Sequence, residues 1–489
     1  MMYNHMKIDT GTKVVKLRFF ITIIVTVCLM LALGVTSEFP RRQDMAATSS
    51  ITDISTWSTA HNTTDAGKMT QSPVTQQPPQ TSVTKLDGDI ASIFEQINSK
   101  GYTFQKPVTA DFLKFHNENT DPRFVEKLKA GLEENSYENE IFYNIFGSTL
   151  LTLYDKYEQK NDSHIISFTD SKLPSVLTFA GDVNLSDDSK NMKYLKSQNN
   201  DITKCLSEPL LNRMRAADLF MVNNEFAFSN RGAPLKGKTY TFRSKPENVK
   251  YLQEMGVDIV SLANNHAFDY GETAFYDTMD TLKDAGIEYV GGGSNLQEAS
   301  KTQYYIINGV KIAIVAGSRV ERIMITPGAK ENSPGVFRML DPALFLEKIK
   351  EAKSNADFVI AYVHWGVEST YTLEQFQKET GKKIIDSGAD IIIGCHPHVL
   401  QGIEYYKGKP IIYSLGNFWF SAKKIESALL EVTIKSPNDI SIAVEPCLQS
   451  STGTKLLTAE SERKKVFDLL VSISPSKITF DKDGVITAG

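Results

Sequence analysis

The feature that most constrains the fold is an alternation of short apolar runs with helical stretches from about residue 174 onward. Runs such as "SVLTFA", "DLFMV", "VDIVSLA", "KIAIVAG", "DFVIAYV" and "ADIIIG" predict strands. The stretches "PENVKYLQEMG", "ETAFYDTMDTLKDAG", "PALFLEKIKEAKS" and "EQFQKETGKKIIDSG" lie between strands and predict helices. This alternation indicates an α/β domain. The consecutive strands "KPIIYSLG" and "SALLEVTIK" favour a mixed sheet or two sheets over one parallel sheet.

Polar residues follow directly after most of these strands. They are Asp182, Asn184, Asn223, Asn224, Glu225, Asn264, Asn265, His266, Asp269, His364, Glu368, His396, His398 and Asn417. Ligands of α/β folds bind outside the carboxyl ends of the strands, so these side chains are expected to meet. Four of the eight histidines fall between residues 266 and 398, each at a predicted strand end.

Carboxylate, amide and imidazole groups together form a ligand set for divalent metal ions. Each residue alone has a plainer interpretation. Asp182 could cap a turn, Asn264 and Asn265 could be turn formers, and His364 could be a core histidine. Their common placement favours a metal site. Cys395 is either a soft ligand or a buried thiol, and we favour the thiol.

The first 37 residues predict a membrane segment. Lys7, Lys13, Lys16 and Arg18 precede an apolar run over 19–35, which is about long enough to cross a bilayer. A cleavable signal peptide has the same layout, but no clean Ala-x-Ala site follows. We therefore favour an uncleaved single-pass anchor in the cell membrane, with the remaining chain extracytoplasmic.

Two further regions precede the α/β domain. Residues 38–87 are rich in Ser, Thr, Pro and Gln and predict a disordered linker. Residues 88–170 predict a helical lead-in, in which His116 and His164 are expected at the surface. The α/β domain with a C-terminal β extension fills 171–489. The formal net charge of −5 argues against nucleic acid as a partner.

The stretch from about 174 to 421 resembles the CapA family of capsule synthesis proteins associated with poly-γ-glutamate. The residues that carry the resemblance are "FAGDVNL", "NNEFAFS", "YTFRSKPENVKYLQEMGVDIVSLANNHAFDYG", "HWGVE" and "GCHPHVLQGIEYYKGKPIIYSLGNFWF". This family is in turn similar to calcineurin-like metallophosphoesterases. The resemblance implies a four-layer α/β/β/α sandwich and a site for two divalent ions, such as Mn, Fe or Zn.

The resemblance also implies roles for single residues. The residues that look like metal ligands are Asp182, Asn184, Glu225, Asn265, His364, His396 and His398. Asn184 stands where the related enzymes have a histidine, a departure that would weaken one metal site. The Gly-Asp-x-x-Asp pattern of those enzymes is absent. His266 would protonate a leaving oxygen. Asp269 would orient His266 or cap the next helix, and Glu368 would support His364.

Arg243 and Asn417 are candidate substrate-binding residues, although Arg243 fits a structural ion pair equally well. The leading hypothesis is an anchored, extracytoplasmic CapA-like protein that acts in synthesis or export of an anionic capsule polymer, with other capsule proteins as partners. The first rival is a metal-dependent phosphoesterase acting on a cell-envelope or small phosphate ester. The second is a non-catalytic, polymer-binding assembly protein.

Overall fold

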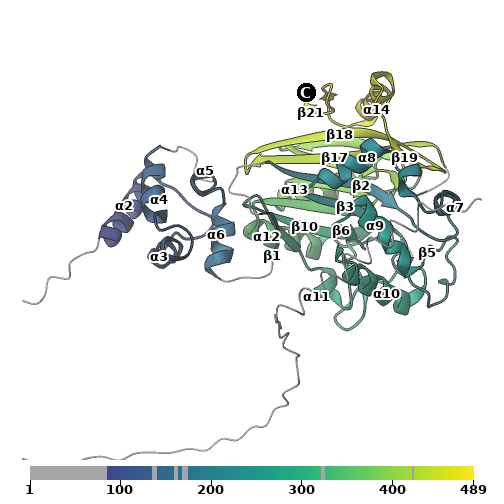
Figure 1. The fold of residues 1–489 in the computed structure, drawn as a ribbon, viewed down its shortest axis with the longest axis horizontal. Coiled ribbons are helices and arrows are strands. Elements are labelled where there is room, and N and C mark those ends of the chain that lie inside the picture. Colours follow the sequence, from purple (N-terminus) through teal and green to yellow (C-terminus); the bar gives the residue numbers. More distant parts are fainter. Residues whose placement is uncertain (1–84, 135–139, 159–162, 168–173, 321–324, 421–422) are drawn as a thin grey trace, which may run out of the picture. The chain divides into compact units, whose positions relative to one another are not determined.

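The computed structural model describes residues 85–134, 140–158, 163–167, 174–320, 325–420 and 423–489 (Figure 1). The predicted anchor over 1–37 lies outside these ranges, as does the predicted linker up to residue 84. Within the described part of the chain, none of the helices combines the length and the apolar character that crossing a bilayer requires.

The lead-in is helical, as predicted. Its helices are α2 (Lys85–Lys100), α3 (Ala110–Asn119), α4 (Phe124–Glu134), α5 (Ile141–Phe146) and α6 (Leu150–Tyr157). Thr109 and Thr149 cap the first turns of α3 and α6, each accepting a backbone N–H. These helices enclose an apolar cluster of their own around Phe112 and Phe124.

The surface prediction for His116 is wrong. Its side chain is buried in the helical cluster, and its ring nitrogens lie 2.8 Å from Thr120 Oγ1 and 3.0 Å from the Leu153 carbonyl oxygen. Burial lowers its pKa to about 4, so the ring is neutral at pH 7. Two local hydrogen bonds are enough to satisfy a neutral imidazole inside an apolar cluster.

Two large mixed sheets form the main domain, which confirms the α/β class. The first sheet has seven strands in the order β1-β9-β10-β12-β13-β15-β14. Their bounds are β1 Ser163–Ser167, β9 Gln303–Ile307, β10 Val310–Arg319, β12 Phe358–Trp365, β13 Ile391–Cys395, β14 Leu400–Tyr406 and β15 Lys409–Leu415. The strands β10, β12, β13 and β15 are parallel, while β9 runs antiparallel to β10 and β14 antiparallel to β15. Because β1 pairs with β9, the first sheet begins inside the region predicted as lead-in.

The second sheet has eight strands. Seven follow the order β19-β18-β17-β2-β3-β6-β7, and β16 pairs with β2. Their bounds are β2 Ser175–Val183, β3 Leu219–Asn224, β6 Ile259–Ser261, β7 Glu288–Val290, β16 Asn417–Trp419, β17 Ile425–Ser436, β18 Asp439–Ser450 and β19 Gly453–Leu456. Figure 1 shows the long antiparallel pair β17 and β18 beside β2 and β3.

Helices and short elements complete the main domain. The helices are α7 (Lys190–Ser197), η2 (Ile202–Lys204), α8 (Glu208–Ala216), η3 (Pro246–Asn248), α9 (Val249–Met255), α10 (Gly271–Asp284), α11 (Leu296–Ala299), α12 (Ala343–Asn355), α13 (Gln375–Asp386) and α14 (Glu460–Ile473). The short strands are β4 (Ala227–Phe228), β5 (Arg243–Ser244), β8 (Gly292–Gly293), β11 (Gly335–Val336), β20 (Ile478–Phe480) and β21 (Ile486–Ala488).

Apolar side chains on the two faces of each sheet enter different clusters. In β12, Ile360 and Tyr362 join a cluster that includes Phe179 of β2 and therefore draws on both sheets. The alternate residues Val359 and Ala361 instead pack with helices α12 and α13. In the same way, the outer face of β3 packs with α8, α9 and α10. Both faces of the central strands are thus covered, which explains why their sequences are continuous apolar runs.

Candidate metal centre

The carboxyl ends of strands from both sheets meet at one buried site. Asp182 near the end of β2 is paired in register with Asn223 of β3 and with Asn417 of β16. In the first sheet, His364 of β12 is paired with Cys395 of β13. The approach of β2 to the chain before β16 is close, because a Cβ on Gly181 would lie 1.9 Å from the Gly416 carbonyl oxygen. Glycine at 181 therefore lets β2, which carries Asp182, approach the chain before β16.

Glu225 is the hub of this site. Its side chain is fully buried, and Oε1 lies 3.9 Å from His364 Nε2, 3.9 Å from His398 Nε2 and 4.0 Å from His266 Nε2. These distances exceed hydrogen-bond length, and Oε1 has no hydrogen-bond partner among the described residues. An unpaired buried carboxylate oxygen is costly. Three imidazole nitrogens around it create the surroundings that a bound cation would satisfy.

Among the described residues, two of the four candidate groups of donor atoms share Glu225. Glu225, His364 and His396 form the first group, and Asp182, Glu225 and His398 form the second, with the ligand atoms of each group within 4.8 Å of one another. Asn265 adds an amide oxygen to the first group, because its Oδ1 lies 2.8 Å from His364 Nε2. Nitrogen and oxygen donors in this arrangement fit a pair of divalent ions such as Mn, Fe or Zn.

The two carboxyl groups of the site differ in protonation. Burial alone would raise the pKa of Asp182, but the hydrogen bond and charge of His398, together with the hydrogen bond from Asn223, outweigh burial and lower that pKa. Burial, and then the charge of Asp182, raise the pKa of Glu225 well above its usual value. A cation between the two groups would favour the ionised form of both.

The histidine loop after β13 is held in an uncommon backbone conformation. His396 has φ of 98° and His398 has φ of 58°, on either side of Pro397. Left-handed backbone at residues other than glycine costs about 1–3 kcal/mol and persists only where surrounding contacts impose it. Here the backbone N–H of His396 donates to Asp182 Oδ2 over 3.2 Å. The loop is thereby fixed to the carboxylate of the second donor group.

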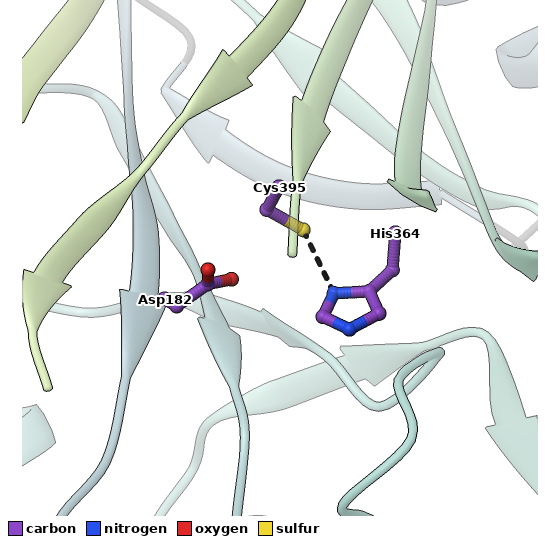
Figure 2. A group of neighbouring side chains, drawn as sticks. All are labelled: Asp182, His364 and Cys395. Atoms are coloured by element: carbon purple, nitrogen blue, oxygen red, sulfur yellow. Dashed lines mark hydrogen bonds between the residues drawn. The ribbon is translucent and has the colours of Figure 1, made fainter. Parts of the chain in front are cut away.

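Cys395 contacts the His364 ring at its Nδ1 atom. Figure 2 shows its sulfur facing Nδ1 of His364, 3.3 Å away. Burial lowers the pKa of His364 and raises that of Cys395, each far from its usual value, so the ring is neutral and the thiol protonated. If Nδ1–H donates to the sulfur, the Nε2 lone pair points toward Glu225 and Asn265, where a metal ligand needs it.

His266 and Asp269 form a pair beside the hub. His266 Nδ1 lies 2.6 Å from Asp269 Oδ2, and Asp269 also accepts the Phe242 backbone N–H over 2.6 Å. Helix α10 begins at Gly271 with Tyr270 as its N-cap residue. Asp269 therefore contacts the imidazole and does not cap the helix. This contact fixes the ring with Nε2 turned toward Glu225.

The remaining predicted residues lie around the donor groups. Asn184 Oδ1, predicted as a metal ligand, accepts the Ser186 backbone N–H over 2.9 Å. Asn417 Oδ1 lies 2.8 Å from His398 Nδ1, so Asn417 positions a ligand. Arg243 stacks on Tyr270, 4.2 Å from the ring centroid, and lines a cleft of about 500 Å³ that Asn184 also lines.

That cleft adjoins the metal centre. The Phe242 ring, which lines it, lies 4.3 Å from the His266 ring, and the Phe420 ring lies 4.6 Å from the His398 ring. Two aromatic side chains thus separate the cleft from the two imidazoles. Arg243 is placed at the cleft and not at the metal ligands, as suits a residue that contacts the distal part of a substrate.

Three contributors were not in the predicted site. Asn223 Nδ2 donates to Asp182 Oδ1 over 2.8 Å and to Glu225 Oε2 over 3.1 Å. Asn264 Nδ2 donates to Asn223 Oδ1 over 3.0 Å. Lys238, a side chain only 7% exposed, forms an ion pair with Asp269 over 2.8 Å. The two asparagines follow strands, which was a usable signal, whereas Lys238 lies in a long loop whose sequence carries none.

Residues 176–422 match the family described as bacterial capsule synthesis protein PGA_cap. The chain belongs to this family. It is 36% identical over 259 residues to the PGA biosynthesis protein CapA of Bacillus subtilis (strain 168), covering 50% of this chain and 67% of that protein. It is 33% identical over 237 residues to the capsule biosynthesis protein CapA of Bacillus anthracis, covering 47% of this chain and 57% of that protein.

Solved structures show a more distant likeness. A hypothetical protein from Thermus thermophilus aligns with a TM-score of 0.36 and 17% identity, covering 55% of this chain and 99% of that one. A putative 5′-nucleotidase from Staphylococcus aureus aligns with a TM-score of 0.35 and 16% identity, covering 63% of this chain and 57% of that one.

Proposed function

We propose that this capsule synthesis family member is a membrane-anchored, extracytoplasmic protein whose α/β domain carries a dimetal hydrolase site. It would act on an anionic capsule polymer, poly-γ-glutamate or a similar one, during synthesis or export, together with other capsule proteins. Family membership supports the capsule role. The basic residues before the apolar run at 19–35 support the anchor. The division of apolar residues between the faces of the two sheets supports the four-layer α/β/β/α order.

One observation carries the proposed hydrolase site. Glu225 Oε1 is buried, has no hydrogen-bond partner in the described part of the chain, and lies about 4 Å from three imidazole Nε2 atoms. The hydrogen bond from Asn223 reaches only the other oxygen, Oε2, so a purely structural role leaves the burial of Oε1 unexplained. Bound divalent ions would satisfy it and would supply electrophilic activation of a phosphoryl or carbonyl oxygen.

The residues of this chain divide the remaining work. Glu225, Asn265, His364 and His396 would hold one ion, and Asp182, Glu225 and His398 the other. His266 faces the same centre with Nδ1 held by Asp269, so its Nε2 is placed to protonate a leaving oxygen. Arg243 would contact the anionic part of a substrate in the adjoining cleft. The His266–Asp269 pair favours hydrolysis over a purely structural assembly role, because an assembly protein has no use for a held proton donor.

Metal content and turnover together test this function. We expect the purified chain to bind two Mn, Fe or Zn ions and to hydrolyse a generic phosphodiester such as bis(p-nitrophenyl) phosphate. His396→Ala should lose one ion and at least about 100-fold in turnover, because this change removes a ligand. Glu379→Gln, on the exposed face of α13, is the matched control and should change neither. A folded chain that binds no divalent ion would refute the proposal, whereas two bound ions without turnover would leave only the polymer-binding role.

A further inference from the structure

The two donor groups of the centre are unequal. The first has four side chains, namely Glu225, Asn265, His364 and His396, while the second has three, namely Asp182, Glu225 and His398. The resemblance predicts Asn184 as a further metal ligand close to Asp182. In the structure, however, Asn184 Oδ1 already accepts the Ser186 N–H over 2.9 Å. The second group therefore has one donor fewer than the first, which leaves a coordination position for water, substrate or a further side chain.

A carboxylate from another loop lies beside the second group. Glu368 follows β12, and a carboxylate oxygen of it lies within 4.8 Å of ring nitrogens of both His396 and His398. In the sequence it was expected to support His364. The structure places it instead beside the two histidines after β13, at the solvent side of the centre, where its own side chain is exposed.

The backbone around Glu368 is fixed by its neighbours in the chain and by the loop after β13. Gly366 has φ of 94°, and a Cβ at this position would lie 2.8 Å from Gln377 Nε2. Ser369 has φ of 58°, and its N–H donates to the Pro397 carbonyl oxygen over 2.8 Å. Two left-handed residues and one hydrogen bond thus tie the loop of Glu368 to the loop of His396 and His398. Such a conformation is costly and is retained where surrounding contacts impose it.

A second observation points to a ligand at the same place. His396 is 94% buried, since its exposed fraction is 6%, and its Nδ1 has no hydrogen-bond partner among the described residues. Together with Glu225 Oε1, it is one of two unpartnered buried polar atoms in the centre. Cys395 is a poorer candidate for the missing donor, because its sulfur contacts His364 Nδ1 and the Val363 carbonyl oxygen.

We propose that Glu368 is a ligand of the second metal ion and takes the coordination position that Asn184 leaves unfilled. This inference rests on the proposed dimetal site. A ligand on an exposed loop makes the second ion the weaker and more readily exchanged of the two. The first ion, held by four buried side chains, keeps its affinity when Glu368 changes.

Titration with Mn²⁺, followed by calorimetry and by the electron paramagnetic resonance signal of coupled Mn pairs, tests this proposal. Wild-type chain should bind two Mn²⁺ ions. Glu368→Gln should keep the tight site within twofold, weaken the second site at least about tenfold, and lose the coupled-pair signal at equal loading. Glu379→Gln, an exposed carboxylate on α13, is the control and should match the wild type. Asn184→His added to Glu368→Gln should restore the second site.

The outcomes separate the two proposals. If wild type and Glu368→Gln both bind two ions with equal affinities, Glu368 is not a ligand and the dimetal site stands. If the wild type binds fewer than two ions, the dimetal site and the role of Glu368 both fail. Because the side chain of Glu368 is exposed, we expect the variant to fold, and equal thermal midpoints of the chelator-treated proteins would verify this.

Discussion

The amino edge of the two sheets, where strands begin, and the carboxyl edge, where strands end, bury acidic side chains in opposite ways. At the amino edge, Asp390 accepts Lys353 Nζ over 2.9 Å, Lys409 Nζ over 2.8 Å and the Val359 N–H over 2.9 Å. At the carboxyl edge, Glu225 Oε1 faces three imidazoles at about 4 Å and accepts nothing from the described residues. Both carboxyl groups are almost or fully inaccessible to solvent.

This contrast distinguishes structural from functional burial. Asp390, Asp357 and Asp155 at the amino edge each have a cation or hydrogen-bond donors within reach, so their burial is compensated inside the chain. At the carboxyl edge, Asp182 is paired with His398, but Glu225 Oε1 has no hydrogen-bond partner among the described residues. A buried carboxyl oxygen that the chain leaves unpaired indicates a partner from outside the chain.

The largest expected effect follows from Glu225→Gln. We expect it to weaken binding of both metal ions by at least about 100-fold, because both donor groups share this carboxylate. The free energy of unfolding in chelator should stay about the same, since burial already favours the uncharged form of Glu225 and Gln keeps its size. Calorimetric Mn²⁺ titration and urea unfolding in EDTA measure the two quantities. A large loss of stability in EDTA would place Glu225 with the structural carboxylates and break the contrast.

The matched change at the amino edge is Asp390→Asn. Both lysine partners lose their ion pair, so we expect the free energy of unfolding to fall by about 2–3 kcal/mol. Mn²⁺ affinity should stay within twofold of wild type, because Asp390 precedes β13 and the metal ligands follow it. Urea unfolding and metal titration of the same preparation give both values. If metal affinity fell together with stability, the structural role of the amino edge and the metal-binding role of the carboxyl edge would not be independent.

The pH dependence of Asp357 gives a smaller effect. Burial raises its pKa to about 6, although Thr149 Oγ1 and the Lys311 N–H donate to it. The folded chain then holds this proton more tightly than the unfolded chain, whose aspartates have a pKa near 3.9. Its contribution to stability is therefore present at low pH and is lost as pH rises from about 4 to about 6.

Over that window we expect wild type to lose on the order of 1–2 kcal/mol relative to Asp357→Asn. Urea unfolding of both proteins in EDTA at pH 4, 5, 6 and 7 measures the difference and cancels groups that titrate equally in both. A difference that stays constant across the window would show that Asp357 is ionised throughout and fully compensated.

The smallest effect concerns Cys395, whose sulfur contacts His364 Nδ1. Cys395→Ala removes the acceptor of the Nδ1 proton and should weaken the first metal ion by about tenfold, as loss of an outer hydrogen-bond partner does. Cys447→Ala is the control, because Cys447 is also fully buried but packs in the apolar cluster behind the second sheet. Mn²⁺ titration checks both variants. A loss far beyond 100-fold would make Cys395 a ligand itself.

Much of this site could be predicted, because sheet geometry determines where residues that follow strands lie. A polar residue after a buried strand has one place to go, so Asp182, Glu225, Asn265, His364, His396 and His398 converge as expected. The α/β class followed from the same alternation of strands and helices. The left-handed backbone at His396 and His398 was not predictable, because contacts across the site impose it.

Residues on loops escaped prediction for a physical reason. Lys238 and Glu368 reach their partners through loop conformations that no local periodicity encodes. The interpretation of Asn184 depended on its place in a motif, whereas a backbone N–H two residues on determines where its amide points. His116 was expected at the surface because a lone histidine in a helix gives no sign of which helices will cover it.

Anomalous X-ray scattering from crystals soaked in Mn²⁺ tests the central claim most directly. Two peaks should lie about 3.5–4 Å apart on either side of Glu225. One should lie within bonding distance of Asn265, His364 and His396, and the other of Asp182 and His398. An ordered site without an anomalous peak, or with Mn²⁺ bound only elsewhere, would contradict the account.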